Sequence, residues 1–257
     1  MPESKIARLL ADLVARLPDI VPVAGLYAAG SMGTRDFEPA RSDLDLVAVL
    51  ERPVESAELA LLSTMHRDLA QQGSAPVGDR LHCLYAASPD VADESREWPY
   101  WRGDKMSARR LSAITRLELH DHGVVVAGEP IAGQIPYVTP DELTDAVRFE
   151  LETVWLPAAQ SKLRWLEDDW VDLGLTVLPR AQAALAEGVL LTKTQAIAQL
   201  SDFDVPEWLR QDMLARRRGW ARETGLRFRM RRAKLAQELV HRGVSRLLHD
   251  LSARGEG

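Results

Sequence analysis

Asp43 and Asp45 alternate with leucines at the start of an apolar run that ends at Leu50. This pattern is typical of a buried strand. Successive strand side chains point to opposite faces, so the two carboxylates share one face and repel each other unless a cation lies between them. Mg²⁺ is the usual cation, because it prefers oxygen ligands and is commonly bound by carboxylates together with substrate phosphates. The spacing therefore predicts metal-dependent phosphate chemistry, and the alternative is a strand that begins with two solvated acids.

A second motif, Gly30-Ser31, closes the preceding apolar segment. Glycine lets a ligand approach the backbone, and the glycine amide and serine hydroxyl can hold phosphate oxygens. Separated by eleven residues from Asp43 and Asp45, the motif resembles the nucleotidyltransferase signature of the DNA polymerase β superfamily. The resemblance implies that Gly30, Ser31 and Ser42 bind the phosphates of ATP as co-substrate. It also implies that Asp43 and Asp45 are catalytic and hold Mg²⁺.

His82 lies in a strand expected over residues 78–86, where members of the superfamily commonly carry a third acid. That acid ligates metal or acts as a general base. Imidazole can serve as a base near pH 7 but is a poor ligand for Mg²⁺, which prefers oxygen. Asp79 would face the other side of a regular strand. His82 is therefore the predicted catalytic base, with an ordinary strand histidine as the alternative. The missing acid weakens the expectation of an active enzyme.

Composition bounds the class of protein. The 257 residues are 46% hydrophobic, which is ample for a buried core. A net charge of −6 argues against a nucleic-acid partner held by a general basic surface, and it leaves room for a small cationic substrate. One cysteine, Cys83, fits a reducing cytoplasm. Charged residues interrupt residues 1–17, so this segment is expected to be neither a signal peptide nor a membrane span. A monomer or weak oligomer is expected.

Periodicity divides the chain in two. Strands are expected over 23–29, 46–50, 78–86 and 123–130, and helices over 1–17, 56–72 and 109–122. The aromatic segment 98–101 lies in an expected connection, where it either stacks on a base or caps the core. After a boundary at 133–139, every pattern is helical. We therefore predict an α+β fold, with a mixed sheet and helices in domain 1–137 and an all-α bundle in domain 138–257.

The helical half extends the resemblance. The segments ITRLELHDHGVVVAGEP and LGLTVLPRAQAALAEGVLLTKTQAIAQL are similar to those of aminoglycoside adenylyltransferases, which modify streptomycin and spectinomycin at the 3″ or 9 hydroxyl. The resemblance implies that Lys193 reaches the nucleotide phosphates and that Trp170, Asp169 and Asp172 bind a cationic substrate. Aromatic faces and carboxylates suit such a substrate. The alternatives are an exposed lysine in the first turn of a helix and ordinary acidic capping.

The resulting hypothesis is transfer of AMP from Mg·ATP to a hydroxyl of a small, cationic, aminoglycoside-like molecule. One alternative is a nucleotidyltransferase acting on another acceptor, such as a metabolite, a protein or an RNA. The other is a relative that binds nucleotide or ligand without turnover, which the replacement of an acid by His82 makes a real possibility. The run Arg227–Arg232 is interpreted as one solvated face of a helix.

Overall fold

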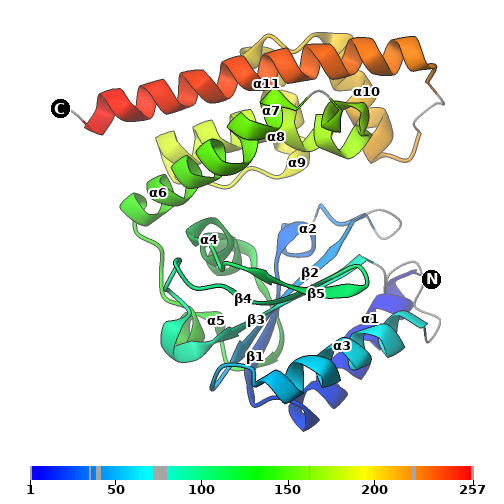
Figure 1. The fold of residues 1–257 in the computed structure, drawn as a ribbon, viewed down its shortest axis with the longest axis vertical. Coiled ribbons are helices and arrows are strands. Elements are labelled where there is room, and N and C mark those ends of the chain that lie inside the picture. Colours follow the sequence, from blue (N-terminus) through cyan, green and yellow to red (C-terminus); the bar gives the residue numbers. More distant parts are fainter. Residues whose placement is uncertain are drawn as a thin grey trace. The chain divides into compact units, whose positions relative to one another are not determined.

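The chain folds into two compact units, Met1–Val138 and Thr139–Gly257, called here the sheet unit and the helical unit (Figure 1). The computed structural model describes residues 2–34, 36–38, 42–71, 80–161, 163–220 and 224–255. The first unit is a mixed sheet with helices and the second is helical, which confirms the predicted α+β class. Whether the units are the functional domains 1–137 and 138–257 stays a prediction.

In the described part of the sheet unit, six strands form one sheet in the order β5-β4-β3-β2-β1-β6. Strands β2 and β3 run parallel, and the other neighbouring pairs are antiparallel. Both strands of the parallel pair are almost wholly buried, which explains their continuous apolar runs. The strands are β1 (Val23–Ala28), β2 (Leu44–Leu50), β3 (Leu81–Ala87), β4 (Trp98–Arg102), β5 (Lys105–Arg109) and β6 (Val124–Gly128).

Helices cover both faces of this sheet (Figure 1). Alternate residues of β2 divide between two apolar cores: Leu44 and Leu46 pack on the face of α1 and α3, whereas Val47 and Val49 pack on the face of α4 and α5. Asp45 has the parity of Val47, so it lies on the α4 face. The helices are α1 (Pro2–Arg16), α2 (Gly30–Gly33), α3 (Ser56–Gln71), α4 (Ala113–His122) and α5 (Ile131–Gln134), with short 3₁₀ turns η1 (Leu17–Asp19) and η3 (Ser88–Asp90).

The hairpin β4–β5 corrects two expectations. The aromatic segment is strand β4 instead of a connection, and Arg109 ends β5 instead of opening a helix, which begins only at Ala113. Trp98 and Trp101 are buried in the cores on opposite faces of the sheet, so they do not form a stacking surface. Gly103, with φ 66°, makes the tight turn between the strands. Asp79 and the predicted helix end at residue 72 lie outside the described residues.

The first helix of the helical unit begins at Pro140. A proline inside a helical pattern favours a break, so the sequence predicts an interruption at Pro157. Instead the chain stays helical, because Pro157 lies in the first turn of α7 after a π-helical stretch, η4. In the described ranges, no helix combines the length and apolar character needed to cross a membrane. The elements are α6 (Pro140–Glu150), η4 (Leu151–Trp155), α7 (Leu156–Gln160), η5 (Arg164–Leu166), α8 (Asp168–Glu187), α9 (Lys193–Gln199), η6 (Leu200–Phe203), α10 (Glu207–Arg217) and α11 (Leu226–Gly255).

The basic run also departs in part from its interpretation. The run is helical as expected, because α11 starts at Leu226, and Arg227, Arg229 and Arg231 are exposed. Arg232, however, is only 1% exposed, because its guanidinium forms ion pairs inside the helical unit. One member of the run is therefore a structural residue and not part of a solvated face.

Candidate active site

The Gly-Ser motif lies against the second aspartate. Strand β1 ends at Ala28, and the Ala29 amide donates to the Asp45 carbonyl oxygen over 2.9 Å, which joins the start of α2 to the start of β2. Gly30 has φ 65°, and a Cβ at this position would lie 2.7 Å from Asp45 Oδ2. A side chain here would meet both left-handed backbone strain and the carboxylate, so the position favours glycine.

His82 completes this group from the neighbouring strand. The parallel register of β2 and β3 sets Asp45 opposite His82, and His82 Nδ1 lies 3.0 Å from Asp45 Oδ1. The His82 side chain is 10% exposed and that of Asp45 is 43% exposed, so the pair lies at the edge of the core and is open to solvent on the Asp45 side. An ionised carboxylate only accepts hydrogen bonds, so Nδ1 is the donor and Nε2 is the acceptor of the neutral ring.

Ser42 and Asp43 lie just before β2. The Ser42 hydroxyl accepts from the Glu38 amide at 2.9 Å, and the Ser42 amide donates to the Glu38 carbonyl at 2.8 Å. Arg80 donates to the Ser42 carbonyl at 2.8 Å, which ties this loop to the start of β3. Asp43 is exposed, and Ser31 is half-buried in α2. The structure thus brings Gly30, Asp45 and His82 into one group, with the remaining predicted residues of this unit adjacent in the chain.

Strand β4 adds residues that the sequence analysis missed. Leu84 pairs with Tyr100 and His82 pairs with Arg102, so both β4 side chains share the face of His82. The rings of Tyr100 and His82 are 6.0 Å apart. Arg109 Nη1 donates to the Tyr100 hydroxyl over 3.0 Å, and its guanidinium carbon lies 5.0 Å from the centre of the Tyr100 ring.

The ionisation of Tyr100 reflects this charged setting. Burial raises the pKa of Tyr100, the Arg109 guanidinium opposes the shift, Asp45 adds to it, and Arg102 opposes it. The phenol therefore stays protonated at neutral pH, where it can donate a hydrogen bond while accepting one from Arg109. A Gly-Asp pair between two short segments is a hairpin signal that could have located the turn, although it does not show the contact between Tyr100 and Arg109.

The donor set is compatible with Mg²⁺. Among the described residues, no group of three or more His, Cys, Asp or Glu side chains is placed to hold a metal ion. Mg²⁺, however, is often bound by one or two carboxylates together with substrate phosphates. Asp43 and Asp45 supply such oxygens, and the missing Cβ of Gly30 keeps space beside Asp45 Oδ2. These two aspartates could hold the ion, whereas the His82 nitrogen is an unsuitable ligand.

The predicted site residues of the helical unit lie in different local settings. Lys193 is exposed in the first turn of α9, which the Thr192 side chain caps. Asp169 is exposed in the first turn of α8. The Trp170 ring is covered by the Arg164 guanidinium at 4.9 Å, so one aromatic face is already in use by a cation. Roles of these residues in nucleotide or substrate binding stay predictions.

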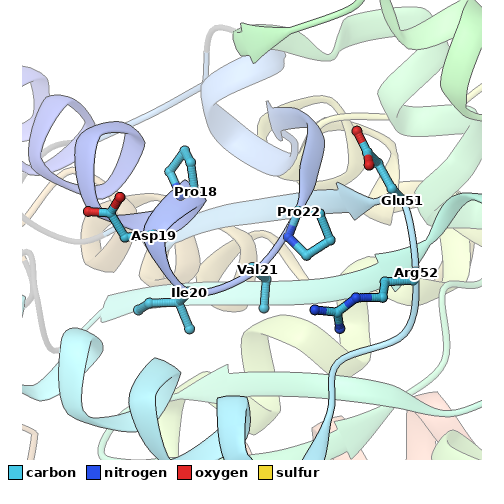
Figure 2. A pocket seen from close by; sticks show the side chains of 7 residues that line it. All are labelled: Pro18, Asp19, Ile20, Val21, Pro22, Glu51 and Arg52. Carbon is cyan, nitrogen blue, oxygen red and sulfur yellow. The ribbon is translucent and has the colours of Figure 1, made fainter.

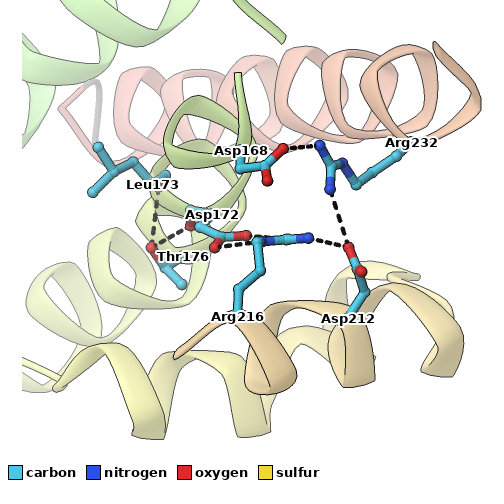
Figure 3. A network of polar contacts seen from close by, with 7 residues as sticks. All are labelled: Asp168, Asp172, Leu173, Thr176, Asp212, Arg216 and Arg232. Atoms are coloured by element: carbon cyan, nitrogen blue, oxygen red, sulfur yellow. Dashed lines mark hydrogen bonds and ion pairs between the residues drawn. The ribbon is translucent and has the colours of Figure 1, made fainter. Parts of the chain in front are cut away.

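Asp172 belongs to a network of ion pairs inside the helical unit (Figure 3). Arg216 Nε donates to Asp172 Oδ2 at 3.0 Å, and the same guanidinium binds Asp212. Burial alone would lower the pKa of Arg216, but hydrogen bonds to Asp172 and Asp212 raise it, so the residue stays charged. Arg232 joins Asp212 to Asp168. The Asp172 carboxylate therefore has a structural partner, and any role in binding substrate stays a prediction.

A recess of about 520 Å³ lies at the other end of β2 from Asp45 (Figure 2). It is open and its Arg52 side chain is bound to Glu58, with Nη2 at 2.7 Å from Oε1. None of the predicted site residues lines it, so it does not compete with the Asp45 group as a candidate active site. Its lining residues are Pro18, Asp19, Ile20, Val21, Pro22, Glu51 and Arg52.

Comparisons with known proteins support the fold. The structure is similar to the crystal structure of spectinomycin adenyltransferase AAD(9) from Enterococcus faecialis, solved with ATP and spectinomycin. The likeness has a TM-score of 0.69, covers 95% of this chain and 98% of the other, and comes with 14% sequence identity. No protein-family model matches the sequence, and no curated protein matches it significantly. The chain thus shares its fold with this adenyltransferase, in agreement with the α+β fold that the sequence predicted.

Proposed function

We propose that this chain is a nucleotidyltransferase that moves AMP from ATP to a hydroxyl group of a small molecule. The observation that carries the proposal is the convergence of Gly30, Asp45 and His82 at the start of β2. In one place the chain offers backbone access for phosphate, a carboxylate for a metal and an imidazole that can accept a proton. The likeness in fold to an adenyltransferase solved with ATP supports the same reaction class.

Each residue has a role in this reaction. Gly30, Ser31 and Ser42 would bind the triphosphate, and Asp43 and Asp45 would hold Mg²⁺. When bound, Mg²⁺ neutralises charge on the phosphoryl oxygens. Asp45 is suited to two tasks, because Oδ1 accepts from His82 while Oδ2 is the oxygen nearest Gly30.

His82 would receive the proton. With Nδ1 held by Asp45, the Nε2 atom takes the proton of the acceptor hydroxyl. The hydroxyl oxygen forms a bond to the α-phosphorus as the bond from that phosphorus to the bridging oxygen breaks. The products are the AMP ester of the acceptor and pyrophosphate.

The resemblance assigns further roles to the helical unit. Lys193 would bind the nucleotide phosphates, and Trp170, Asp169 and Asp172 would receive a cationic acceptor. An aminoglycoside is therefore the first acceptor to test. Lys193→Ala should raise the KM for ATP without changing the KM for the acceptor. An unchanged KM for ATP would remove Lys193 from the site.

The test is to incubate the protein with Mg·ATP and spectinomycin or streptomycin, and to measure pyrophosphate release and the mass of an AMP adduct. Asp45→Asn should abolish product. Asp19→Asn, which removes an exposed carboxylate at the far end of β2, should leave the activity unchanged. Equal turnover by Asp45→Asn and the unmodified protein would refute the proposed site.

A second candidate function is nucleotide binding without turnover. The observation that favours it is His82 in place of the third acid, with a nitrogen already hydrogen-bonded to Asp45. Calorimetry separates the two functions: ATP binding with no pyrophosphate release supports the binding protein, whereas steady release excludes it. His82→Glu should raise turnover if the missing acid limits the rate, and no gain would count against the placement of this residue in the site.

A further inference from the structure

The geometry of the sheet assigns the two ends of the proposed reaction to different strands. Gly30 approaches Asp45 from the β1 side, whereas His82 approaches it from β3, on the other side of β2. In phosphoryl transfer, the attacking and leaving oxygens lie roughly in line on opposite sides of the phosphorus. With the triphosphate at Gly30 and the proton acceptor at His82, pyrophosphate leaves toward β1. The acceptor molecule therefore lies over β3, β4 and β5.

This acceptor side of the sheet is basic. Strands β3, β4 and β5 contain no acidic residue, and Asp104 lies in the turn between the last two. Arg102, Lys105 and Arg109 are all exposed. Arg102 is opposite His82 in the antiparallel register and shares its face. A basic group is thus adjacent to the predicted proton acceptor, on the side away from the leaving pyrophosphate.

Arg102 and Arg109 do more than protect the edge of the sheet from pairing with other chains. Lys and Arg often protect an exposed edge from pairing with other chains, and Lys105 on the outer strand β5 fits that role. Arg102, in contrast, is on the inner strand β4. Arg109 is on β5, but its guanidinium turns over the Tyr100 ring and donates to the Tyr100 hydroxyl at 3.0 Å. Both groups are therefore part of the site face.

We propose that the acceptor carries an anionic oxygen group, a phosphate ester or a carboxylate, and that Arg102 and Arg109 bind this group beside the reacting hydroxyl. Guanidinium groups suit such anions because they offer paired donors in a planar fork. The protonated Tyr100 hydroxyl, held by Arg109, adds a further donor. A polycationic sugar would instead meet like charges at this face, which disfavours its binding. The proposal rests on the proposed nucleotidyl transfer and changes its acceptor class.

The test uses small-molecule pools of defined charge, because the acceptor is unidentified. A metabolite extract is separated by ion exchange into anionic, neutral and cationic pools, and each is incubated with the full chain, Mg²⁺ and ATP labelled in the α-phosphate. Spectinomycin serves as a defined cationic probe. A portion of the anionic pool is first treated with phosphatase: loss of labelled product identifies a phosphate ester, and persistence identifies a carboxylate.

Arg102→Gln is the diagnostic variant. Loss of one charge-assisted contact should lower kcat/KM for acceptors in the anionic pool by about tenfold or more, with the KM for ATP unchanged. Arg67→Gln is the matched control, because Arg67 is an exposed arginine on α3, which packs on the opposite face of the sheet. It should leave kcat/KM unchanged.

Three outcomes decide the matter. Label in the anionic pool that depends on Arg102 supports the proposal. Labelled product found mainly in the neutral or cationic pool, or on spectinomycin, overturns the anionic-acceptor proposal and leaves the nucleotidyl transfer intact. Anionic product whose formation is unchanged by Arg102→Gln has the same consequence. No labelled product from any pool or from spectinomycin refutes the transfer reaction itself, and the anionic acceptor falls with it.

Discussion

Gly30→Ala tests whether the Gly-Ser motif and Asp45 form one site. The left-handed backbone at φ 65° costs an alanine about 1–2 kcal/mol. The new methyl group would also lie 2.7 Å from Asp45 Oδ2. The cheapest relief is rotation of the carboxylate, which breaks its hydrogen bond to His82 and costs roughly a further 1.5–3 kcal/mol. The total loss in the free energy of unfolding is about 2.5–5 kcal/mol.

Gly103→Ala provides the control, because Gly103 has nearly the same φ, 66°, and nothing within 4 Å of the added methyl group. It should lose only the backbone cost. Urea unfolding gives the two stabilities, and calorimetry gives ATP affinity in the presence of Mg²⁺. We expect Gly30→Ala to bind ATP at least about tenfold more weakly and Gly103→Ala to bind it normally. Equal losses of stability in the two variants, with normal ATP binding by Gly30→Ala, would refute the close approach of Gly30 to Asp45.

Two other predictions concern stability. Burial lowers the pKa of His66 from 6.5 to about 3, so between these values the unfolded chain binds a proton that the folded chain does not. Stability should fall as the pH drops through this window, by at most about 1.4 kcal/mol per pH unit. His66→Phe, which can keep the stack on Trp101, should flatten that slope in urea unfolding at about pH 4 to 6, and an unchanged slope would contradict the assignment. Arg216→Met should destabilise the chain by roughly 3–5 kcal/mol, because it leaves the partly buried Asp172 carboxylate without its cation, whereas Asp212 keeps its ion pair with Arg232. Lys234→Met, at an exposed surface pair, should change the unfolding free energy by less than about 1 kcal/mol, and similar losses for both variants would argue against the buried network.

The local pattern of apolar residues was enough to predict most of the fold. Apolar periodicity located β1, β2 and the long helices, because the buried residues of each element are apolar and recur at the spacing of a strand or a helix. The hairpin β4–β5 escaped because Trp98 and Trp101 are buried on opposite faces, which leaves no alternation of apolar and polar residues. The burial of Arg232 was not predicted, because its ion-pair partners Asp168 and Asp212 are distant in the sequence.

Only part of the candidate site could be predicted from the sequence. Gly30 and Asp45 carry a recognisable motif, and the apolar residues around His82 indicated that it lies in a strand. Tyr100 and Arg109 carry no motif. Their contact arises from the pairing of β4 with β5, and charge alone cannot show whether an arginine faces solvent or a neighbouring phenol.

The sequence by itself determined the class of fold and the position of the Gly-Ser and Asp-x-Asp motifs, because both depend on residues close together in the chain. Only the tertiary structure decided what surrounds Asp45. The register of β2, β3 and β4 places His82 beside the carboxylate and Arg102 beyond it. Such a register is set by packing between strands that are distant in sequence, and a slip of one residue would turn each of these side chains to the opposite face.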